Sequence, residues 1–322
     1  MSSGRRELIA LGAVVAAATV AVLSYRSHRR HGARRRNRVA TADGKRRVCV
    51  VCTGSVAAVK AAPLCRALIE ALGVRVDLVL TRAAEHFQGV DYKGRKGWKD
   101  LRELQRRRGR RRRRRTREEG GADGADNDDD DDVDTPWLEV WTDQDEWENY
   151  KSVGDAVLHV DLAKRNSLLL LAPLCANTLS LLASGGCPNL ATSVCRAWYS
   201  GGLEEVFAEP LTAKYGAQAV ERPVVAAPAM NTVMWHQAQT RRALATLTGG
   251  ETPRDVGFIT RVVPPQVKTL ACGDTGTGAM AEVDDIVAEV RTALAAFVAA
   301  EEAAAAAGLP PFPGLVSVST GK

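Results

Sequence analysis

The sequence lacks the cysteine pattern of a disulfide framework. Seven cysteines, an odd number, are scattered over 322 residues, whereas disulfide-rich secreted domains carry an even set at short spacings. Cys49 and Cys52 have the spacing of a redox or zinc pair, but they lie in the apolar run VCVVC, which is typical of a buried strand. We therefore expect a reducing compartment and no metal site.

The chain also lacks a mixture of basic and aromatic residues that would bind nucleic acid. The net charge is +6 and the isoelectric point is about 9.0, but the basic residues are concentrated in two tracts. No aromatic residue interleaves with the arginines of the second tract, and a run of aspartates follows to neutralise them. Nucleic acid is therefore not an expected partner.

An N-terminal segment, residues 8–25, carries no charged side chain. As a helix it would span about 27 Å, close to the thickness of a bilayer's hydrocarbon core. A heavy basic cluster, RSHRRHGARRRNR, follows it where a signal peptide would have its cleavage site. The positive-inside rule then predicts that residues 1–46 form an anchor and basic linker, with the rest of the protein in the cytosol. A mitochondrial targeting segment and a spurious extension of the reading frame remain open alternatives.

Two other segments are too polar or too irregular to join a hydrophobic core. Residues 92–135 contain an arginine block followed by an aspartate block, so we expect a disordered insertion. Residues 299–322 begin as an alanine-rich continuation of a helix and end in Pro/Gly coil, so we expect a disordered tail.

Between these segments, short apolar runs alternate with amphipathic ones. RVCVVC, VRVDLVL and SLLLLAP are rich in Val and Leu, which is typical of strands covered on both faces. Residues 282–300 have the pattern of a closing amphipathic helix. This alternation predicts one doubly wound α/β domain with a parallel sheet, Rossmann- or flavodoxin-like, over residues 47–298.

The turns that follow two strands predict a ligand site. Gly54 and Ser55 follow the first strand, and Asn177 and Thr178 start a helix after Pro173 ends the middle strand. The carboxyl ends of parallel strands meet at one edge of a sheet, where helix N-termini bind phosphate. Because the G-x-G-x-x-G dinucleotide fingerprint is absent, we favour a mononucleotide. Helix capping alone would explain each turn taken separately.

A third strand end, VVAAPAMNTVMW at residues 224–235, has unusual chemistry. The strand ends at Pro228, and Met230, Met234 and Trp235 then surround a single amide, Asn231. A solvent-exposed turn would be rich in Gly, Ser or Asp. This apolar surface predicts that either a second core or a flat ligand covers the loop.

Seven stretches of the chain can be compared with known families, in the order GSVAA, DEWE, VLHVDL, APLCANTLSLLASG, NLATSVCRAW, PAMNTVMW and LACGDTGTGAMAE. Together they resemble the 4′-phosphopantothenoylcysteine decarboxylase family, the FMN-dependent enzymes of coenzyme A synthesis. The resemblance covers residues 47–90 and 141–298. It implies bound FMN, the small-molecule substrate 4′-phosphopantothenoylcysteine, and a homotrimer with the flavin near subunit contacts.

The resemblance also implies a reaction. The substrate carboxylate cannot leave directly, because the resulting carbanion has no electron sink. In the family, the flavin oxidises the thiol-bearing carbon to a thioaldehyde, CO2 leaves, and re-reduction of the enethiol gives 4′-phosphopantetheine. This scheme needs a base near the thiol, an amide for the carboxylate and an acid for the last protonation.

Three residues match the family's chemical groups. His159 matches the active-site histidine, Asn231 matches the ligand of the substrate carboxylate, and Cys272 matches the proton donor to the enethiol. Taken alone, they would be read as a satisfied histidine, a turn amide and a small buried hydrophobe.

Two further sets of residues match the family's binding positions. A flap over the substrate, which glycines in GDTGTGAM would allow to close, includes Thr269, Leu270 and Ala271. The positions that match FMN contacts are Gly54, Ser55, Val56, Thr81, Arg82, Ala83, Cys175, Ala176, Asn177, Thr178 and Ala229.

The chain departs from the family pattern in several places. Cys175 stands where Ser or Asp is usual, and Pro188 replaces an acidic residue. Ala163 and Lys164 stand where paired arginines are usual, with Arg165 displaced by one position. Since lysine substitutes poorly for a bidentate arginine, we expect altered substrate affinity.

Two rival functions follow from the same resemblance. One is a non-catalytic flavoprotein relative that inhibits a Ser/Thr phosphatase, which the absence of His159 or Cys272 or an acidic C-terminal tail would favour. Here both residues are present and the acidic run is internal. The other is a sibling flavoprotein acting on a peptide C-terminal cysteine or a prenyl donor, and the ACGD segment argues against the prenyl branch.

Overall fold

The computed structural model describes residues 45–92, 94–107, 136–199, 222–249, 257–269 and 275–306. All of them belong to one compact unit, Val39–Lys322, and the second unit, Met1–Arg38, lies outside the described residues. The expected anchor at residues 8–25 is therefore not among them. In the described ranges, no helix combines the length and the apolar character that crossing a bilayer requires.

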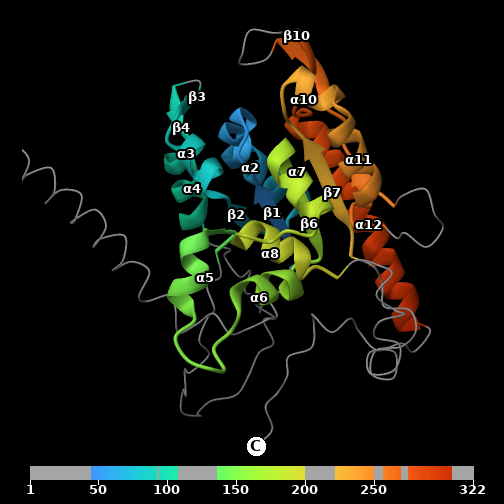
Figure 1. Cartoon of the computed structure of the whole chain (residues 1–322). Helices are drawn as coiled ribbons and strands as arrows, with labels where there is room; N and C mark the ends of the chain where they lie inside the picture. The colour runs from blue at the N-terminus through green and yellow to red at the C-terminus, as the bar shows by residue number, and fades with distance from the viewer. Residues whose placement is uncertain are drawn as a thin grey trace, which may run out of the picture. The chain divides into compact units, whose positions relative to one another are not determined.

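Six parallel strands form the central sheet, which confirms the predicted fold class (Figure 1). Their spatial order is β5-β2-β1-β6-β7-β8, and every neighbouring pair is parallel. The strands are β1 (Arg47–Cys52), β2 (Arg75–Leu80), β5 (Leu138–Trp141), β6 (Leu168–Leu174), β7 (Val224–Pro228) and β8 (Arg261–Val262). The direction of strand addition reverses between β1 and β6, and α/β proteins bind ligands at the carboxyl ends beside such a reversal.

Helices cover both faces of this sheet, because successive side chains of a strand point to opposite sides. On β1, Val48 and Val50 join one core, and Cys49 and Val51 join the other. The first core packs against α2 (Ala61–Leu72), α4 (Gly97–Arg106) and α12 (Val283–Ala306). The second packs against α6 (Leu158–Arg165), α7 (Ala176–Ala183), α8 (Leu190–Arg196) and α11 (Ala238–Leu247).

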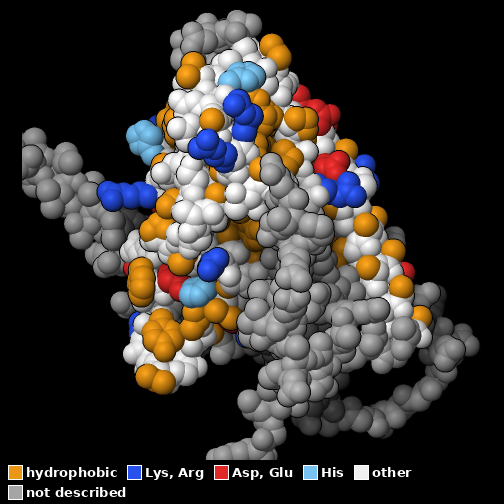
Figure 2. Space-filling view, turned by 45° about the vertical axis from the view of Figure 1, so that its right-hand side comes forward, with side chains coloured by type: hydrophobic (Ala, Val, Ile, Leu, Met, Phe, Trp, Pro, Cys, Tyr) orange, Lys and Arg blue, Asp and Glu red, His pale blue; other side chains and the backbone are white. Residues whose placement is uncertain are grey.

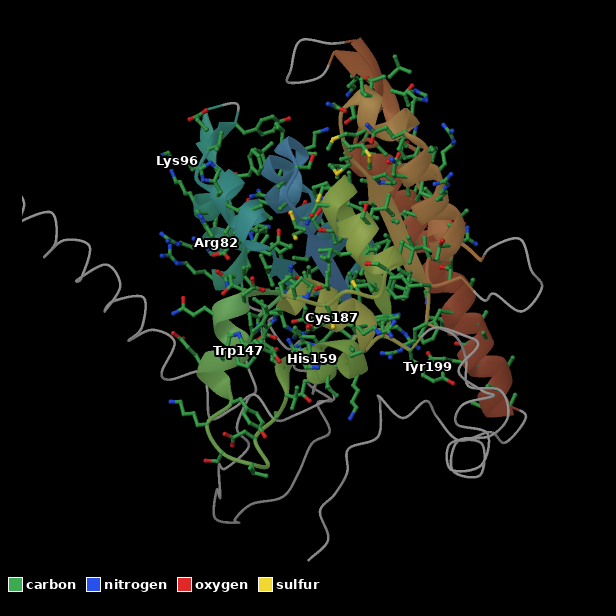
Figure 3. The ribbon with its side chains drawn as sticks, viewed as in Figure 1. Arg82, Lys96, Trp147, His159, Cys187 and Tyr199 are labelled. Carbon is green, nitrogen blue, oxygen red and sulfur yellow. The ribbon has the colours of Figure 1, made fainter. Side chains whose placement is uncertain are left out.

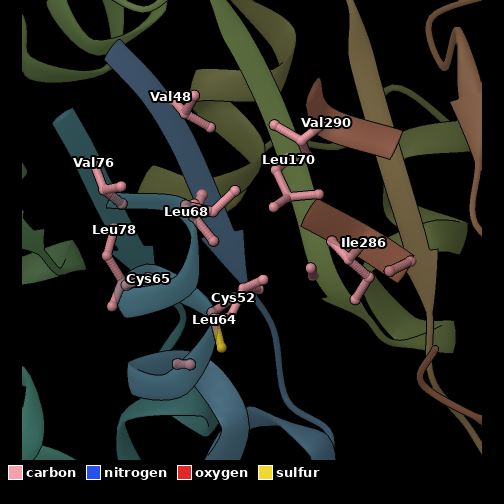
Figure 4. Packing of buried hydrophobic residues seen from close by; sticks show 14 of the residues in the cluster. Val48, Cys52, Leu64, Cys65, Leu68, Val76, Leu78, Leu170, Ile286 and Val290 are labelled. Carbon is pink, nitrogen blue, oxygen red and sulfur yellow. The ribbon is translucent and has the colours of Figure 1, made fainter. Parts of the chain in front are cut away.

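Figure 4 shows how the first core is filled. Leu64 and Leu68 of α2 and Ile286 and Val290 of α12 pack against the strands, where Leu170 projects from β6. Each of these side chains is fully buried. The apolar runs of the strands and the helical spacing of these residues account for the doubly wound arrangement.

Shorter elements connect the layers at the strand ends. They comprise the 3-10 helix η2 (Val56–Lys60), α3 (Arg82–Gln88), α5 (Asp143–Asn149), α10 (Thr232–His236), and the antiparallel pairs β3 (Asp91–Tyr92) with β4 (Arg95–Lys96) and β9 (Gln266–Thr269) with β10 (Thr275–Ala279). The segment after Ser55 therefore begins as a 3-10 turn before it continues as α2.

The expectation that residues 92–135 are disordered was wrong for their first part. Residues 95–106 form β4 and α4, and α4 buries Asp100, Leu101 and Leu104. Leu101 and Leu104 are spaced three apart and both join the core beside α2. The high charge of LRELQRRR hid this short apolar stripe. Residues 108–135, which hold most of the arginine block and all of the aspartate block, lie outside the described residues.

The start of the expected disordered tail, at residue 299, was also placed too early. Helix α12 continues to Ala306, because the alanine-rich stretch after residue 299 has a high helix propensity. Residues 307–322 lie outside the described residues.

Replacing residues 108–135 with a short Gly/Ser linker is expected to leave the fold and flavin content unchanged. The two ends lie close together, since the Trp137 N–H donates to the Arg107 carbonyl at 3.5 Å. A longer deletion of residues 95–135 also removes α4, and each buried leucine lost costs about 2–5 kcal/mol. Thermal unfolding should therefore separate the two variants. Equal loss of stability would mean that residues 108–135 contribute to the core.

Candidate active site

The turns after β1 and β6 are joined by a buried threonine, Thr53. Its backbone N–H and its hydroxyl both donate to the Pro173 carbonyl, at 3.1 and 2.7 Å. The same hydroxyl oxygen accepts the Cys175 N–H at 2.8 Å. Thr53 thereby aligns two of the predicted flavin turns at the strand reversal. Sequence reasoning missed it, although a threonine between a buried strand and Gly54 was a usable signal.

The turns after β1 and β2 also approach each other closely. A Cβ atom at Gly54 would lie 2.6 Å from the Cβ of Ala83, so glycine is required there. The Ser55 hydroxyl oxygen accepts the Ala57 N–H at 3.4 Å, and the Thr81 hydroxyl oxygen accepts the Ala84 N–H at 3.3 Å. These side chains cap η2 and α3, which is the capping role that the sequence left open.

Helix α7 begins one residue earlier than the sequence predicted. Cys175 is its N-cap, so Ala176, Asn177 and Thr178 form the first turn. The backbone N–H groups of such a turn have no partner within their own helix, and they carry the positive end of the helix dipole. Asn177 is exposed, whereas Thr178 is buried with its hydroxyl 3.4 Å from the Cys175 sulfur. This end of α7 is suited to bind an anionic group.

The loop after β7 lies at the same edge. The Ala229 N–H donates to the Leu174 carbonyl at 2.9 Å, and the Met230 N–H donates to the Gly278 carbonyl at 3.0 Å. A Cβ at Gly278 would lie 2.2 Å from the Met230 carbonyl oxygen, so β10 packs directly on this loop. Asn231 is exposed and caps α10, its side-chain oxygen accepting the Met234 N–H at 2.8 Å.

Met230 of this loop packs partly buried against the second core, whereas apolar side chains of α10 remain on the surface. Val233 is 66% exposed and Met234 43% exposed. The described residues thus do not close a second core over them, which favours the alternative of a ligand. Leu270, Ala271 and Cys272 lie outside the described residues, as does the Thr269 side chain, so the predicted flap and proton donor stay predictions.

His159 lies elsewhere, on α6, and it is paired with a carboxylate that sequence reasoning did not single out. Its ring Nδ1 lies 2.6 Å from Glu146 Oε1, and its backbone N–H donates to Glu146 Oε2 at 3.1 Å. Glu146 belongs to the DEWE stretch, which was the available signal. In Figure 1, α6 is near the bottom and α10 near the top, so one chain does not bring His159 and Asn231 together.

An exposed apolar cluster lies beside this histidine on α5 and the loop that follows. Trp147 is 79% exposed, Tyr150 43% and Val153 99%. Figure 3 shows Trp147 and His159 in the same lower part of the molecule. Hydrophobic side chains also lie on the surface at the lower left of Figure 2, the side on which Figure 1 shows α5. Clustered exposed apolar residues are typical of a contact surface.

A buried ionic cluster anchors the other end of α6. Asp77, fully buried on β2, accepts hydrogen bonds from Arg47, Trp141, Arg165 and Asn166. Burial alone would raise the pKa of Asp77, but the charges of Arg165 and Arg47 and the hydrogen bonds outweigh it and hold that pKa well below its usual range. Glu139 Oε2 forms ion pairs with a guanidinium nitrogen of Arg47 at 3.1 Å and of Arg165 at 3.0 Å.

This cluster explains one departure from the family pattern. The Arg165 guanidinium forms ion pairs with Asp77 and Glu139, so it cannot replace a missing substrate-binding arginine. Lys164 is exposed on the same helix. Pro188 lies in the turn before α8, where Asn189 and Thr192 form a capping box, so the helix start is intact without an acidic residue at position 188.

The described residues contain no cluster of three or more potential metal-binding side chains. The arrangement is instead one of backbone donors at a sheet edge, an exposed amide, an apolar loop and a carboxylate-bound histidine. These groups suit the binding of a phosphorylated planar cofactor and proton transfer to or from a substrate.

The sequence of this chain is similar to a protein family and to several known enzymes. The flavoprotein family model matches residues 36–295. The phosphopantothenoylcysteine decarboxylase of Mus musculus is 33% identical over 256 residues, covering 80% of this chain and 91% of that protein. The enzyme of the same name from Oryza sativa subsp. japonica is 35% identical over 254 residues, covering 77% and 81%.

Solved structures agree with these relatives. A phosphopantothenoylcysteine decarboxylase with a cysteine-to-serine substitution, complexed with pantothenoylaminoethenethiol, is 31% identical, with a TM-score of 0.51, covering 77% of this chain and 97% of that one. HAL3 from Cryptococcus neoformans is 27% identical, with a TM-score of 0.50, covering 79% and 98%.

Proposed function

This chain belongs to the flavoprotein family, among relatives that are phosphopantothenoylcysteine decarboxylases, and from that premise we infer its activity. It is an FMN-dependent carboxy-lyase that converts 4′-phosphopantothenoylcysteine to 4′-phosphopantetheine and CO2 in coenzyme A biosynthesis. The observation that carries this assignment is the meeting of the Met230–Asn231 loop with the flavin turn at the end of β6, through the Ala229 N–H, which donates to the Leu174 carbonyl at 2.9 Å.

The residues present fit the cofactor. Gly54 leaves a cradle against Ala83 that any side chain would fill, and the first turn of α7 offers backbone N–H groups for a phosphate. We propose that FMN is held at these turns and against Met230. When bound, FMN supplies the reversible two-electron oxidation that gives the departing carboxylate its electron sink.

The chain's own residues supply binding and proton transfer. Asn231 uses its side-chain oxygen to cap α10, which leaves its NH2 group as a donor suited to the substrate carboxylate. His159 offers its second ring nitrogen as the base near the thiol. Cys272, matched to the family's proton donor, completes the proposed set.

We propose that the enzyme is a homotrimer in which the site forms between subunits. His159 and Asn231 stand on helices that lie well apart in one chain (Figure 1). The exposed cluster of Trp147, Tyr150 and Val153 beside the histidine is the surface that would contact a neighbouring subunit. Cyclic assembly through one repeated contact would bring His159 of one chain to Asn231 of another.

Decarboxylation by the purified full-length protein is the experiment that tests the function. Visible absorption should show a bound flavin, and mass spectrometry should detect CO2 and 4′-phosphopantetheine after addition of 4′-phosphopantothenoylcysteine. A flavin-containing protein that releases no CO2 would contradict the assignment. The phosphatase-inhibitor alternative is not favoured, because the mouse and rice relatives, which match over most of this chain and of their own length, are decarboxylases.

A further inference from the structure

One carboxylate holds both the backbone and the ring of His159. The two oxygens of Glu146 divide these tasks: Oε2 accepts the backbone N–H at 3.1 Å, and Oε1 lies 2.6 Å from ring Nδ1. The side chains are 30% exposed for His159 and 15% for Glu146. The ring therefore has one nitrogen engaged by protein and retains access to solvent.

Both partners stand on helices that are anchored independently. Helix α5 begins with a capping box, in which Asp145 accepts the backbone N–H and the hydroxyl of Thr142, both at 2.8 Å. Asp143 ties the same turn to α8 by accepting the Leu190 N–H at 2.9 Å. Rigid supports of this kind hold a side-chain pair in one geometry.

The far end of α6 is anchored as well. Asn166, its C-cap, donates to Asp77 at 2.9 Å, and the Arg222 guanidinium donates to the Ala163 carbonyl and, at 2.9 Å, to the Asn166 carbonyl. Burial lowers the pKa of Arg222 to about 10, which still leaves a cation at the negative end of the helix dipole at neutral pH. Helix α6 is thus held at both ends, with His159 at its N-terminal end.

The chemistry of this contact decides which ring nitrogen carries hydrogen. An ionised carboxylate only accepts hydrogen bonds, so Nδ1 must be the protonated nitrogen of a neutral ring. The lone pair then resides on Nε2. Since a general base needs an accessible lone pair, Nε2 is the atom that takes the substrate proton.

We propose that Glu146 is a positioning residue for the decarboxylation, which orients His159 and selects the tautomer with a basic Nε2. This rests on the proposed function. The other acidic side chains of α5 have different partners: Asp143 and Asp145 hold helix starts, and Glu148 accepts from Gln144 on the exposed side of the helix. Glu148 is therefore the matched control.

The test compares Glu146→Ala, Glu146→Gln and Glu148→Gln in the flavin-bound enzyme. We expect Glu146→Ala to lower kcat about 100-fold with little change in KM, because loss of an orienting partner affects a base more than binding. Glu146→Gln should lose less, since its amide oxygen still accepts the Nδ1–H. Glu148→Gln should match the wild type. All three variants should retain flavin, and both Glu146 variants should unfold at a slightly lower temperature, because the His159 backbone N–H loses its carboxylate acceptor.

A second readout does not depend on activity. NMR of protein with 15N-labelled histidines reports which ring nitrogen of each histidine is protonated. The chain has five histidines, and the signal that is missing from His159→Asn belongs to His159. Hydrogen on Nδ1 in the wild type and a mixture in Glu146→Ala would support the proposal. Hydrogen on Nε2 in the wild type, or kcat of Glu146→Ala equal to that of Glu148→Gln, would overturn it. A wild type without decarboxylase activity would instead refute the proposed function, and the NMR result would still decide the tautomer.

Discussion

His159→Asn is expected to lower kcat for decarboxylation by about 10²- to 10⁴-fold, the range that general base catalysis contributes. Asparagine keeps an N–H donor for Glu146, but it is smaller than histidine and has no basic nitrogen. The histidine lies away from the flavin turns, and its contacts are with Glu146 on α5, so cofactor binding and folding should be preserved. Single-turnover CO2 release together with the absorption spectrum of the purified variant measures both properties.

His86→Asn is the matched control, because His86 is exposed at the end of α3. It should retain wild-type turnover. Normal turnover by His159→Asn would remove this histidine from the reaction.

A mixture of His159→Asn chains and Asn231→Ala chains tests whether the site forms between subunits. If each site takes His159 from one chain and Asn231 from its neighbour, trimers assembled from equal amounts of the two inactive chains contain intact sites. Random assembly makes about one quarter of the sites intact, so about a quarter of wild-type activity should return. Co-refolding that restores none, with trimers confirmed by sedimentation, would place both residues in one chain's site.

Asp77→Ala is expected to lower the free energy of unfolding by about 3–5 kcal/mol at neutral pH, as removing one partner of a buried ion pair does. The substitution leaves Arg47 and Arg165 with only the partly exposed Glu139 as a counterion. It also removes a hydrogen-bond acceptor from Trp141 and Asn166. Urea unfolding measures the change, and Asp285→Ala, an exposed carboxylate on α12, is the control.

The pH dependence of stability gives an independent check on this cluster. The pKa of Asp77 is lower in the folded protein than in the unfolded chain, where it is about 3.9. Its contribution is therefore fully present above that pH and is lost as the pH falls below it. The wild type should lose more stability than Asp77→Ala between pH 5 and the acid limit of folding. Parallel curves for the two proteins would show that Asp77 titrates normally.

Much of the fold was predictable because it depends on local patterns. Unbroken apolar runs such as SLLLLAP indicated strands buried on both faces, and these are β1, β2, β6 and β7 of a parallel sheet. Helix α4 was missed because two leucines among many charges carry little periodic signal. Its burial comes from contact with α2, which is distant in sequence.

The candidate site was predictable in its parts but not in its connections. Motif resemblance predicted roles for His159, Asn231 and the flavin turns, since those residue types carry the chemistry. Thr53 and Glu146 were missed, because each acts through hydrogen bonds to residues that only the folded chain brings near.

By itself, the sequence determined the alternation of buried strands and helices, the chemistry at three strand ends and the presence of a histidine and an amide suited to decarboxylation. These properties belong to single segments, because periodicity and residue type act locally. Only the tertiary structure decided that Arg165 is committed to Asp77, that Glu146 orients His159 and that His159 and Asn231 lie apart in one chain. Such contacts depend on the packing of distant segments, and packing follows from the whole core rather than from any one stretch of residues.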